Sequence, residues 1–200
     1  MSDNYGFLAP FYQLLSRAVF GRKILEANRA FLAKNLSKKL IIIGGGDGVA
    51  FQKYEKQLDG YYFEKSAKML QLAQKNLKNS QLKFVHGEFR RQEKGDCFFL
   101  PFLLDSLTDE EISALLELIK NSLSPRGKVM MSDFFEPSTR TQKILLQIML
   151  WFFQRLTGHQ RKDLPDYPSF FQKSGFKLVK ERIWEKGWIR AQVYEFDSAD

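Results

Sequence analysis

Residues 40–51, LIIIGGGDGVAF, place four glycines within five positions directly after four aliphatic residues. A strand that runs straight into a glycine-rich turn and then a helix puts the turn at the carboxyl edge of a sheet, where doubly wound folds bind their ligands. Each missing Cβ lets the backbone approach a ligand closely or adopt a positive φ. Because one or two glycines suffice for a tight turn, we interpret the four as a ligand cradle.

The spacing of these glycines limits the choice of ligand. The dinucleotide fingerprint G-x-G-x-x-G fits Gly44 and Gly46, but Val49 occupies its third place, and no Gly-Lys-Ser or Gly-Lys-Thr follows for a phosphate loop. The intact pattern is G-x-G-x-G, and Glu64 stands sixteen positions (64 − 48) after Gly48, behind the next apolar run. A carboxylate at the end of that strand can accept both hydroxyls of a ribose. The pattern therefore favours a ligand that contains a ribose.

Short apolar runs alternate with longer amphipathic segments along the chain, as is typical of a parallel sheet with crossover helices. Strands are predicted at residues 40–43, 61–63, 82–85, 97–100 and 128–134. Helices are predicted twice within 9–35, from Ser66 to Leu77, from Thr108 to about 123, at 138–156 and at 167–173. The crossover at 86–95 is too short for a full helix. Residues 175–196 read as two strands joined by a short turn at 185–187, which forces them to be antiparallel.

We therefore expect an α/β fold with a Rossmann-like, doubly wound sheet, mostly parallel, with a C-terminal antiparallel hairpin and N-terminal helices. The length of 200 residues predicts a single domain at 1–200. Within it we expect an N-terminal helical cap at 1–37 and an α/β core at 38–200, with a helical insertion at about 137–173.

Composition narrows the class of protein further. The single cysteine, Cys97, excludes an intramolecular disulfide, and the first residues lack the pattern of a secretory signal, so we expect a reduced, cytoplasmic protein. The longest apolar stretch, 144–153, is interrupted by Gln147 and is shorter than the ~20 residues that a spanning helix needs. The net charge of +8 is interleaved with acidic residues, which favours a solvated surface over a nucleic-acid site. The sequence does not determine the oligomeric state.

Taken together, these segments resemble the class I S-adenosylmethionine-dependent methyltransferases. IIIGGGDG is similar to the first motif of that family, YYFEKSAKMLQLAQKN to the second strand and helix, and LKFVHGEF to the third strand and adenine-side loop. Residues 96–134 are similar to the fourth strand, its helix, the Pro-x-Gly turn and the fifth strand. The resemblance covers most of the chain, and it implies S-adenosylmethionine as the cofactor and a small molecule as the methyl acceptor.

The resemblance also implies a set of cofactor-binding residues and no metal. The methionine part of the cofactor would face Gly44, Gly45, Gly46 and Gly48, and Glu64 would hold the ribose. Met69, Glu88 and Phe89 would lie at the adenine, and Leu100 and Pro101 would lie beneath the cofactor after strand four. Lys65, next to Glu64, completes the predicted set. Met69 reads equally well as plain core, and Glu88 as an exposed side chain.

Three features depart from the family pattern or leave a choice open. Ile42 occupies a place that often carries an acid. GGGDG is also similar to the first motif of spermidine synthases, but those enzymes carry further acids after strand four, where this chain has LPFLLD with only Asp105. Asp47 either caps the following helix or contacts the ligand. An aminopropyltransferase-like enzyme is therefore an alternative, but methyl transfer is favoured.

Catalysis of methyl transfer requires an in-line acceptor and exclusion of water, and a base only if the acceptor arrives protonated. Candidates are Asp133, at the carboxyl end of a strand, with His159, Tyr5 and Tyr12. His159 also fits a surface position and Tyr12 ordinary packing. The helix at 138–156 is apolar nearly all round, which predicts a buried core helix first, and otherwise a pocket roof or a peripheral membrane contact.

The leading hypothesis is thus a small-molecule methyltransferase with an apolar or aromatic acceptor. A nicotinamide-dependent oxidoreductase is an alternative opposed by Val49. A non-catalytic cofactor-binding protein is a further one, suggested by Ile42 and by the lack of a clear base.

Overall fold

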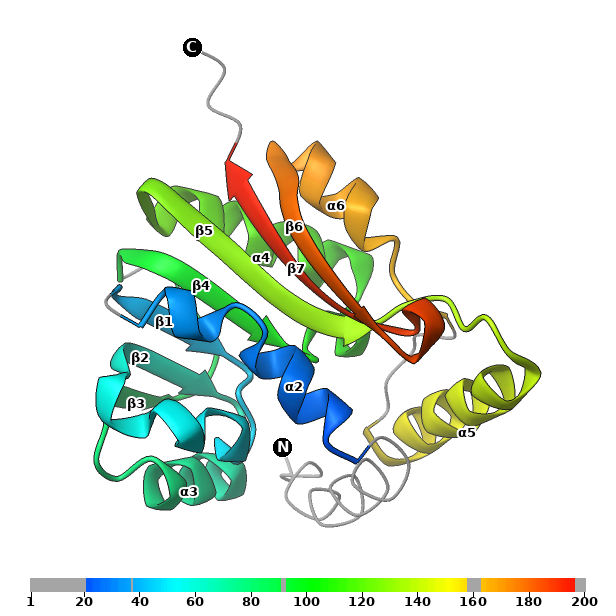
Figure 1. Ribbon diagram of the computed structural model, residues 1–200, viewed down its shortest axis with the longest axis horizontal. Coiled ribbons are helices and arrows are strands. Elements are labelled where there is room, and N and C mark those ends of the chain that lie inside the picture. The colour runs from blue at the N-terminus through cyan, green and yellow to red at the C-terminus, as the bar shows by residue number, and fades with distance from the viewer. Residues whose placement is uncertain (1–20, 37, 91–92, 158–162, 197–200) are drawn as a thin grey trace.

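The structure is a computed structural model that describes residues 21–36, 38–90, 93–157 and 163–196, with only the backbone at 151–157 (Figure 1). The first of the two helices predicted within 9–35 falls largely outside these residues. The second corresponds to a short helix, α2 (Lys23–Arg29), and a 3-10 turn, η1 (Leu32–Lys34).

Seven strands form one sheet in the order β3-β2-β1-β4-β5-β7-β6. Their bounds are β1 Leu40–Ile43, β2 Asp59–Glu64, β3 Gln81–His86, β4 Gly95–Pro101, β5 Leu123–Phe134, β6 Phe176–Trp184 and β7 Ile189–Phe196. Strands β1 to β5 are parallel, whereas β7 runs antiparallel to both β5 and β6. The predicted Rossmann-like sheet with a C-terminal antiparallel hairpin is confirmed.

Strand β1 lies at the centre of the parallel part and explains the aliphatic run before the glycines. All four of its residues are buried, and it pairs with β2 on one side and β4 on the other. Alternate side chains point to opposite faces: Ile41 and Ile43 join one core cluster, Leu40 and Ile42 the other. Since the sheet is covered on both faces, the strand reads as a continuous apolar run.

Helices pack on both faces of the sheet (Figure 1). The cluster around Ile41 receives side chains from α4 (Asp109–Ser122) and α6 (Tyr167–Lys173). The cluster around Leu40 receives them from α3 (Ala67–Asn76) and from η2 (Val49–Gln57). Ser66 caps α3 as predicted, because its hydroxyl accepts a hydrogen bond from the Met69 N–H at 3.4 Å.

The structure differs from the predicted elements at two places. The helix that follows the glycines is a 3-10 helix, η2. Strand β5 begins at Leu123, directly after α4, whereas the sequence suggested that the helix continues to about 123 and that a strand begins at 128. The pairing of β5 with β4 is irregular between Gly95 and Cys97, opposite the segment that contains Pro125. A proline has no N–H to donate to a strand ladder, which accounts for the interruption.

Over residues 140–150, the part of helix α5 (Arg140–Thr157) whose side chains are described, most side chains are exposed or half-buried, which is not the pattern of the predicted buried core helix. Met149 is buried in a cluster with Phe134 and Trp188, whereas Ile144 and Ile148 are 59% and 51% exposed. Residues four apart share a helix face, so one apolar face packs on the sheet and another faces solvent. Among the residues that the structure describes, no helix combines the length and apolar character needed to cross a membrane.

Removal of the α4 cap should destabilise the fold measurably. The Thr108 hydroxyl accepts from the Glu111 N–H at 3.2 Å, and the Glu111 carboxylate accepts from the Thr108 N–H at 2.9 Å. We expect Thr108→Ala to lower the free energy of unfolding by about 0.5–2 kcal/mol in urea titrations. The exposed Ser113→Ala on the same helix is the control, and equal losses in both variants would contradict a specific capping effect.

Candidate functional site

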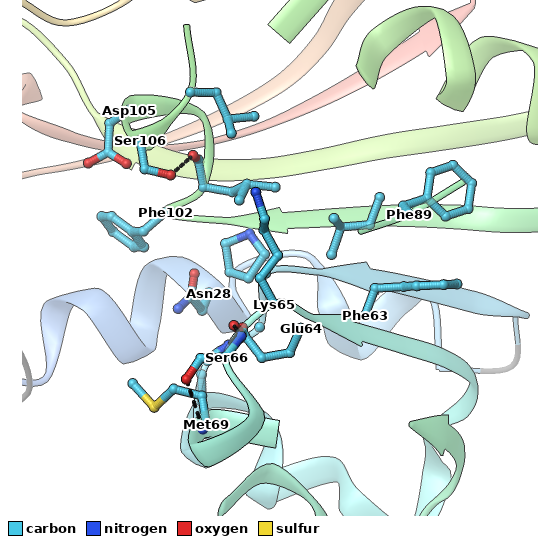
Figure 2. A pocket seen from close by; sticks show the side chains of 18 of the residues that line it. Asn28, Phe63, Glu64, Lys65, Ser66, Met69, Phe89, Phe102, Asp105 and Ser106 are labelled. Carbon is cyan, nitrogen blue, oxygen red and sulfur yellow. Dashed lines mark hydrogen bonds between the residues drawn. The ribbon is translucent and has the colours of Figure 1, made fainter. Parts of the chain in front are cut away.

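A cavity of about 580 Å³ opens at the carboxyl ends of β1, β2 and β4 (Figure 2). Its walls come from α2, the glycine turn after β1, the end of β2, the first turn of α3, the loops after β3 and β4, and one face of α4. This volume is in the range of sites for small molecules and cofactors. The cavity lies where the topology of a doubly wound sheet predicts a ligand.

The glycine turn exposes bare backbone to this cavity for two different reasons. Gly46 has φ +64°, and a Cβ built on it would meet no atom within 4 Å, so its main chain faces open space. A Cβ on Gly45 would instead strike the ring and hydroxyl of Tyr62. Gly46 is therefore required by its conformation, and Gly45 by packing, while both line the cavity.

The carboxylate of Glu64, at the end of β2, is held by two backbone N–H groups of the cavity wall. One carboxylate oxygen accepts from the Gly46 N–H at 3.0 Å and the other from the Ser66 N–H at 2.9 Å. A carboxylate offers about four lone-pair sites, so two such bonds orient it without exhausting it as an acceptor. Glu64 is thus a preorganised acceptor for hydroxyl groups.

Tyr62 of β2 is hydrogen-bonded to the glycine turn after β1. Its hydroxyl donates to the Gly46 carbonyl at 3.0 Å. Burial raises the pKa of Tyr62 well above its ordinary value, and the negative charges of Glu64 and Asp47 act in the same direction. The hydroxyl therefore remains a donor, and residue Gly46 is held at its N–H by Glu64 and at its carbonyl by Tyr62.

An ion pair stands at the rim of the cavity. The Lys65 ammonium lies 2.8 Å from the Glu88 carboxylate, and both side chains are more than half exposed. The hydrogen bond from Lys65 and its charge lower the pKa of Glu88. An exposed pair of this kind contributes little to the stability of the fold.

Nine of the eleven residues predicted to bind the cofactor line this one cavity: Gly44, Gly45, Gly46, Glu64, Lys65, Met69, Glu88, Phe89 and Pro101. The other two do not. A Cβ on Gly48 would lie 2.9 Å from Leu77 Cδ1, so Gly48 faces α3. Leu100 is fully buried in the core beneath β4. Contact of the nine with a cofactor remains a prediction.

The structure places Asp47 and Ile42, the two positions that the sequence left in question. Asp47 lines the cavity and also accepts from the Val49 N–H at 3.2 Å, which is a capping bond at the start of η2. Ile42 is fully buried in the cluster on the face of α3 and η2. Ile42 does not line the cavity.

Asp133 does not face the cavity, which corrects its interpretation as a base that touches the acceptor. It is fully buried and accepts from the N–H groups of Leu104 at 3.1 Å, Asp105 at 3.3 Å and Phe134 at 2.9 Å. It anchors the loop after β4 to β5. Tyr5, Tyr12 and His159 lie outside the described residues.

The loop that Asp133 anchors carries a residue that the sequence did not single out. Asp105 lines the cavity, together with Phe102 and Ser106 of the same loop and Asn28 of α2. The isolation of Asp105 in the apolar string LPFLLD is a signal that could have identified it. Asn28 gives no such signal, because it lies within an ordinary amphipathic segment. Among the described residues, no cluster of His, Cys, Asp or Glu is suited to hold a metal.

Known proteins resemble this chain in sequence and in structure. A family model described as an O-methyltransferase domain matches residues 8–177. O-methyltransferase 4 of Dictyostelium discoideum is 27% identical over 169 residues, which cover 81% of this chain and 48% of that protein. Probable inactive O-methyltransferase 11 of the same organism is 28% identical over 101 residues, covering 50% of this chain and 30% of that protein. The chain thus spans about half the length of these relatives or less.

A solved structure of a DhpI–SAH complex has a TM-score of 0.72 with this chain at 14% identity. The match covers 96% of this chain and 94% of that one. At this identity the likeness establishes the fold alone.

The buried Asp133 predicts a specific dependence of stability on pH. Burial raises the pKa of Asp133 well above its ordinary value, reinforced by the charge of Asp105. A carboxyl with a raised folded-state pKa stabilises the fold fully below its unfolded pKa of about 4, and this contribution is lost as pH rises through the folded pKa. We expect Asp133→Asn to flatten that fall in the free energy of unfolding, measured by urea titration above pH 4. The control is Asp96→Asn, at the amino end of β4. An unchanged dependence of the free energy of unfolding on pH in Asp133→Asn, or equal flattening in Asp96→Asn, would refute this assignment.

Proposed function

This chain belongs to the O-methyltransferase domain family, and on that premise we propose that it binds S-adenosylmethionine and transfers its methyl group to an oxygen of a small molecule. The observation that carries the proposal is the Glu64 carboxylate, fixed between the N–H groups of Gly46 and Ser66 beside bare backbone in the cavity. A ribose diol and an amino-acid tail are the groups that such a pair of features fits.

The order of the strands supports an orientation for the cofactor. Glu64 ends β2 and the glycines follow β1, so a ribose at Glu64 and a methionine tail on the glycines direct the methyl group toward β4 and β5. Lys65, Met69 and the Glu88 loop are left for the adenine. In Figure 2, Phe63 and Phe89 lie at one end of the cavity, Asp105 and Phe102 at the other, and Glu64 between them.

The walls at the β4 end support an apolar or aromatic acceptor. Ile24 and Leu25 of α2 and Phe102 and Leu103 of the β4 loop line this part of the cavity. Asp105 of the same loop also lines the cavity. Apolar walls with an acidic group suit a flat molecule that carries a hydroxyl.

Methyl transfer to a hydroxyl requires the protein to remove a proton, exclude water and hold the acceptor oxygen in line. S-adenosylmethionine supplies a methyl group that its sulfonium has already activated. We propose that Asp105 takes the proton of the acceptor hydroxyl as the oxygen–carbon bond forms and the sulfur–carbon bond breaks, with its electron pair returning to sulfur. The apolar walls exclude water and hold the oxygen in line, about 3–3.5 Å from the methyl carbon.

A non-catalytic cofactor-binding protein is the second candidate. It is favoured by Ile42, which gives the cavity no acid before the glycines, and by the relative named probable inactive O-methyltransferase 11. An aminopropyltransferase would need more acids near Asp105 than the β4 loop supplies. A cytoplasmic location is also proposed, supported by the buried free thiol of Cys97.

Cofactor binding should depend on Glu64. We expect S-adenosylhomocysteine at a hundredfold excess over its Kd to stabilise the protein by about 2.7 kcal/mol, read as a rise in Tm, with no rise for NAD. Glu64→Ala should weaken that binding by about 1.5–3 kcal/mol through loss of charge-assisted hydrogen bonds, measured by calorimetry.

The control for this experiment is Glu195→Ala, which removes an equally sized carboxylate on β7, outside the cavity. Glu64→Gln keeps the shape and separates loss of charge from loss of fold. If Glu64→Ala bound S-adenosylhomocysteine as tightly as the wild type, the ribose assignment would be wrong.

Turnover should depend on Asp105. We expect Asp105→Asn to lower kcat about 10²- to 10⁴-fold on a phenol that the wild type methylates, the usual range for loss of a general base, with the Kd of S-adenosylhomocysteine unchanged. Asp96→Asn at the other end of β4 is the matched control. A wild type that binds S-adenosylhomocysteine yet methylates no phenol of a broad panel would favour the non-catalytic candidate.

A further inference from the structure

Asn28 presents an unusual amide to the cavity. It lies on α2, is 7% exposed and lines the cavity wall. Its side-chain oxygen accepts a hydrogen bond from the Ser132 hydroxyl. Within the part of the chain that the structure describes, its Nδ2 has no hydrogen-bond partner. This donor is not one of the fully enclosed atoms that lack a partner, so it is accessible from the cavity, where a ligand oxygen can accept from it.

Ser132 fixes the direction in which this amide points. It is fully buried on β5, where it is paired with Pro101 of β4 and Ala191 of β7. Its carbonyl accepts from the Phe102 N–H at 2.7 Å. Because the hydroxyl donates to the amide oxygen, the amide presents its N–H groups away from Ser132. The donor is thus held by a strand rather than by a flexible loop.

The hydrogen bond to Ser132 places the Asn28 side chain on the β5 side of the cavity. Ser132 is on β5, two strands from the β1 glycines, and strands lie about 4.8 Å apart, so roughly 10 Å separates them. Figure 2 shows Asn28 toward the end of the cavity that carries Phe102 and Asp105, away from Phe63 and Phe89. In the orientation proposed above, this is the end that the methyl group faces.

We propose that Asn28, oriented by Ser132, is a specificity-determining residue that donates a hydrogen bond to an oxygen of the acceptor. The inference rests on the proposed function and names its substrate class. The site would select phenols that carry a second, hydrogen-bond-accepting oxygen next to the hydroxyl, such as a carbonyl. It would disfavour an amine at that place, because two donors would then face each other in a buried site.

The test uses two phenols of similar size and the protein saturated with S-adenosylhomocysteine. In calorimetric or NMR titrations, the wild type should bind 2-hydroxyacetophenone about three- to tenfold more tightly than 2-aminophenol, the range expected for one neutral hydrogen bond. Asn28→Asp cannot donate and should remove or reverse this preference. Asn28→Leu should remove it.

Ser132→Ala separates orientation from mere packing. It leaves Asn28 in place but frees its amide to turn, so the preference should shrink while both phenols still bind. A purely structural role of Ser132 would weaken both phenols equally. Asn35→Asp makes the same chemical change in a residue outside the cavity, whose amide donates to the Phe31 carbonyl, and should leave the preference intact.

The outcomes distinguish this inference from the proposed function. If the wild type does not bind S-adenosylhomocysteine, both the proposed function and this inference are wrong. If the cofactor product binds but neither phenol does, or if Asn28→Asp and Asn28→Leu keep the wild-type preference, the inference alone fails. It also fails if Asn28→Leu shifts the Kd of S-adenosylhomocysteine, since Asn28 would then serve the cofactor. Melting curves of all variants identify any that do not fold.

Discussion

The site depends on the main-chain grip on the Glu64 carboxylate. The N–H of Gly46 comes from the turn after β1 and the N–H of Ser66 from the turn after β2. One side chain thereby ties the ends of two neighbouring strands together, and Tyr62 holds the same Gly46 peptide from its carbonyl side. A carboxylate with both oxygens bound to rigid backbone needs no reorganisation when a ligand arrives, which is the property expected of a preorganised site.

A second carboxylate, that of Asp133, ties a strand to a loop on the other side of the cavity. Asp133 accepts from the N–H groups of Leu104 and Asp105 and thereby couples β5 to the loop after β4. It is buried and does not line the cavity, yet it holds the backbone of Asp105, which does line it. Two acids of the same type thus have different roles because one is enclosed by the sheet and the other lies beyond its edge.

The order of the strands explains why these two arrangements define separate halves of one cavity. The sheet runs β2-β1-β4-β5, so the Glu64 grip acts on one pair of strands and the Asp133 anchor on the other. The helix α2 crosses to the second half and contributes Asn28 from a segment far away in sequence. The glycine turn lines one half with main chain, and Asn28, Phe102 and Asp105 line the other half with side chains.

The sequence by itself determined the parallel sheet, the hairpin and the meeting of the glycine turn with Glu64 at one cavity. Aliphatic runs, turn glycines and an acid at the end of a strand are local signals, and parallel strands bring their carboxyl ends to one edge of the sheet. Only the tertiary structure decided which side chains line the part of the cavity after β4. Position at a strand end could not tell that Asp133 is buried under its own loop while Asp105 is open, nor that Asn28 meets Ser132 across 104 residues. The burial of Asp133 and the contact of Asn28 with Ser132 depend on which elements pack together, and no short stretch of sequence determines that packing.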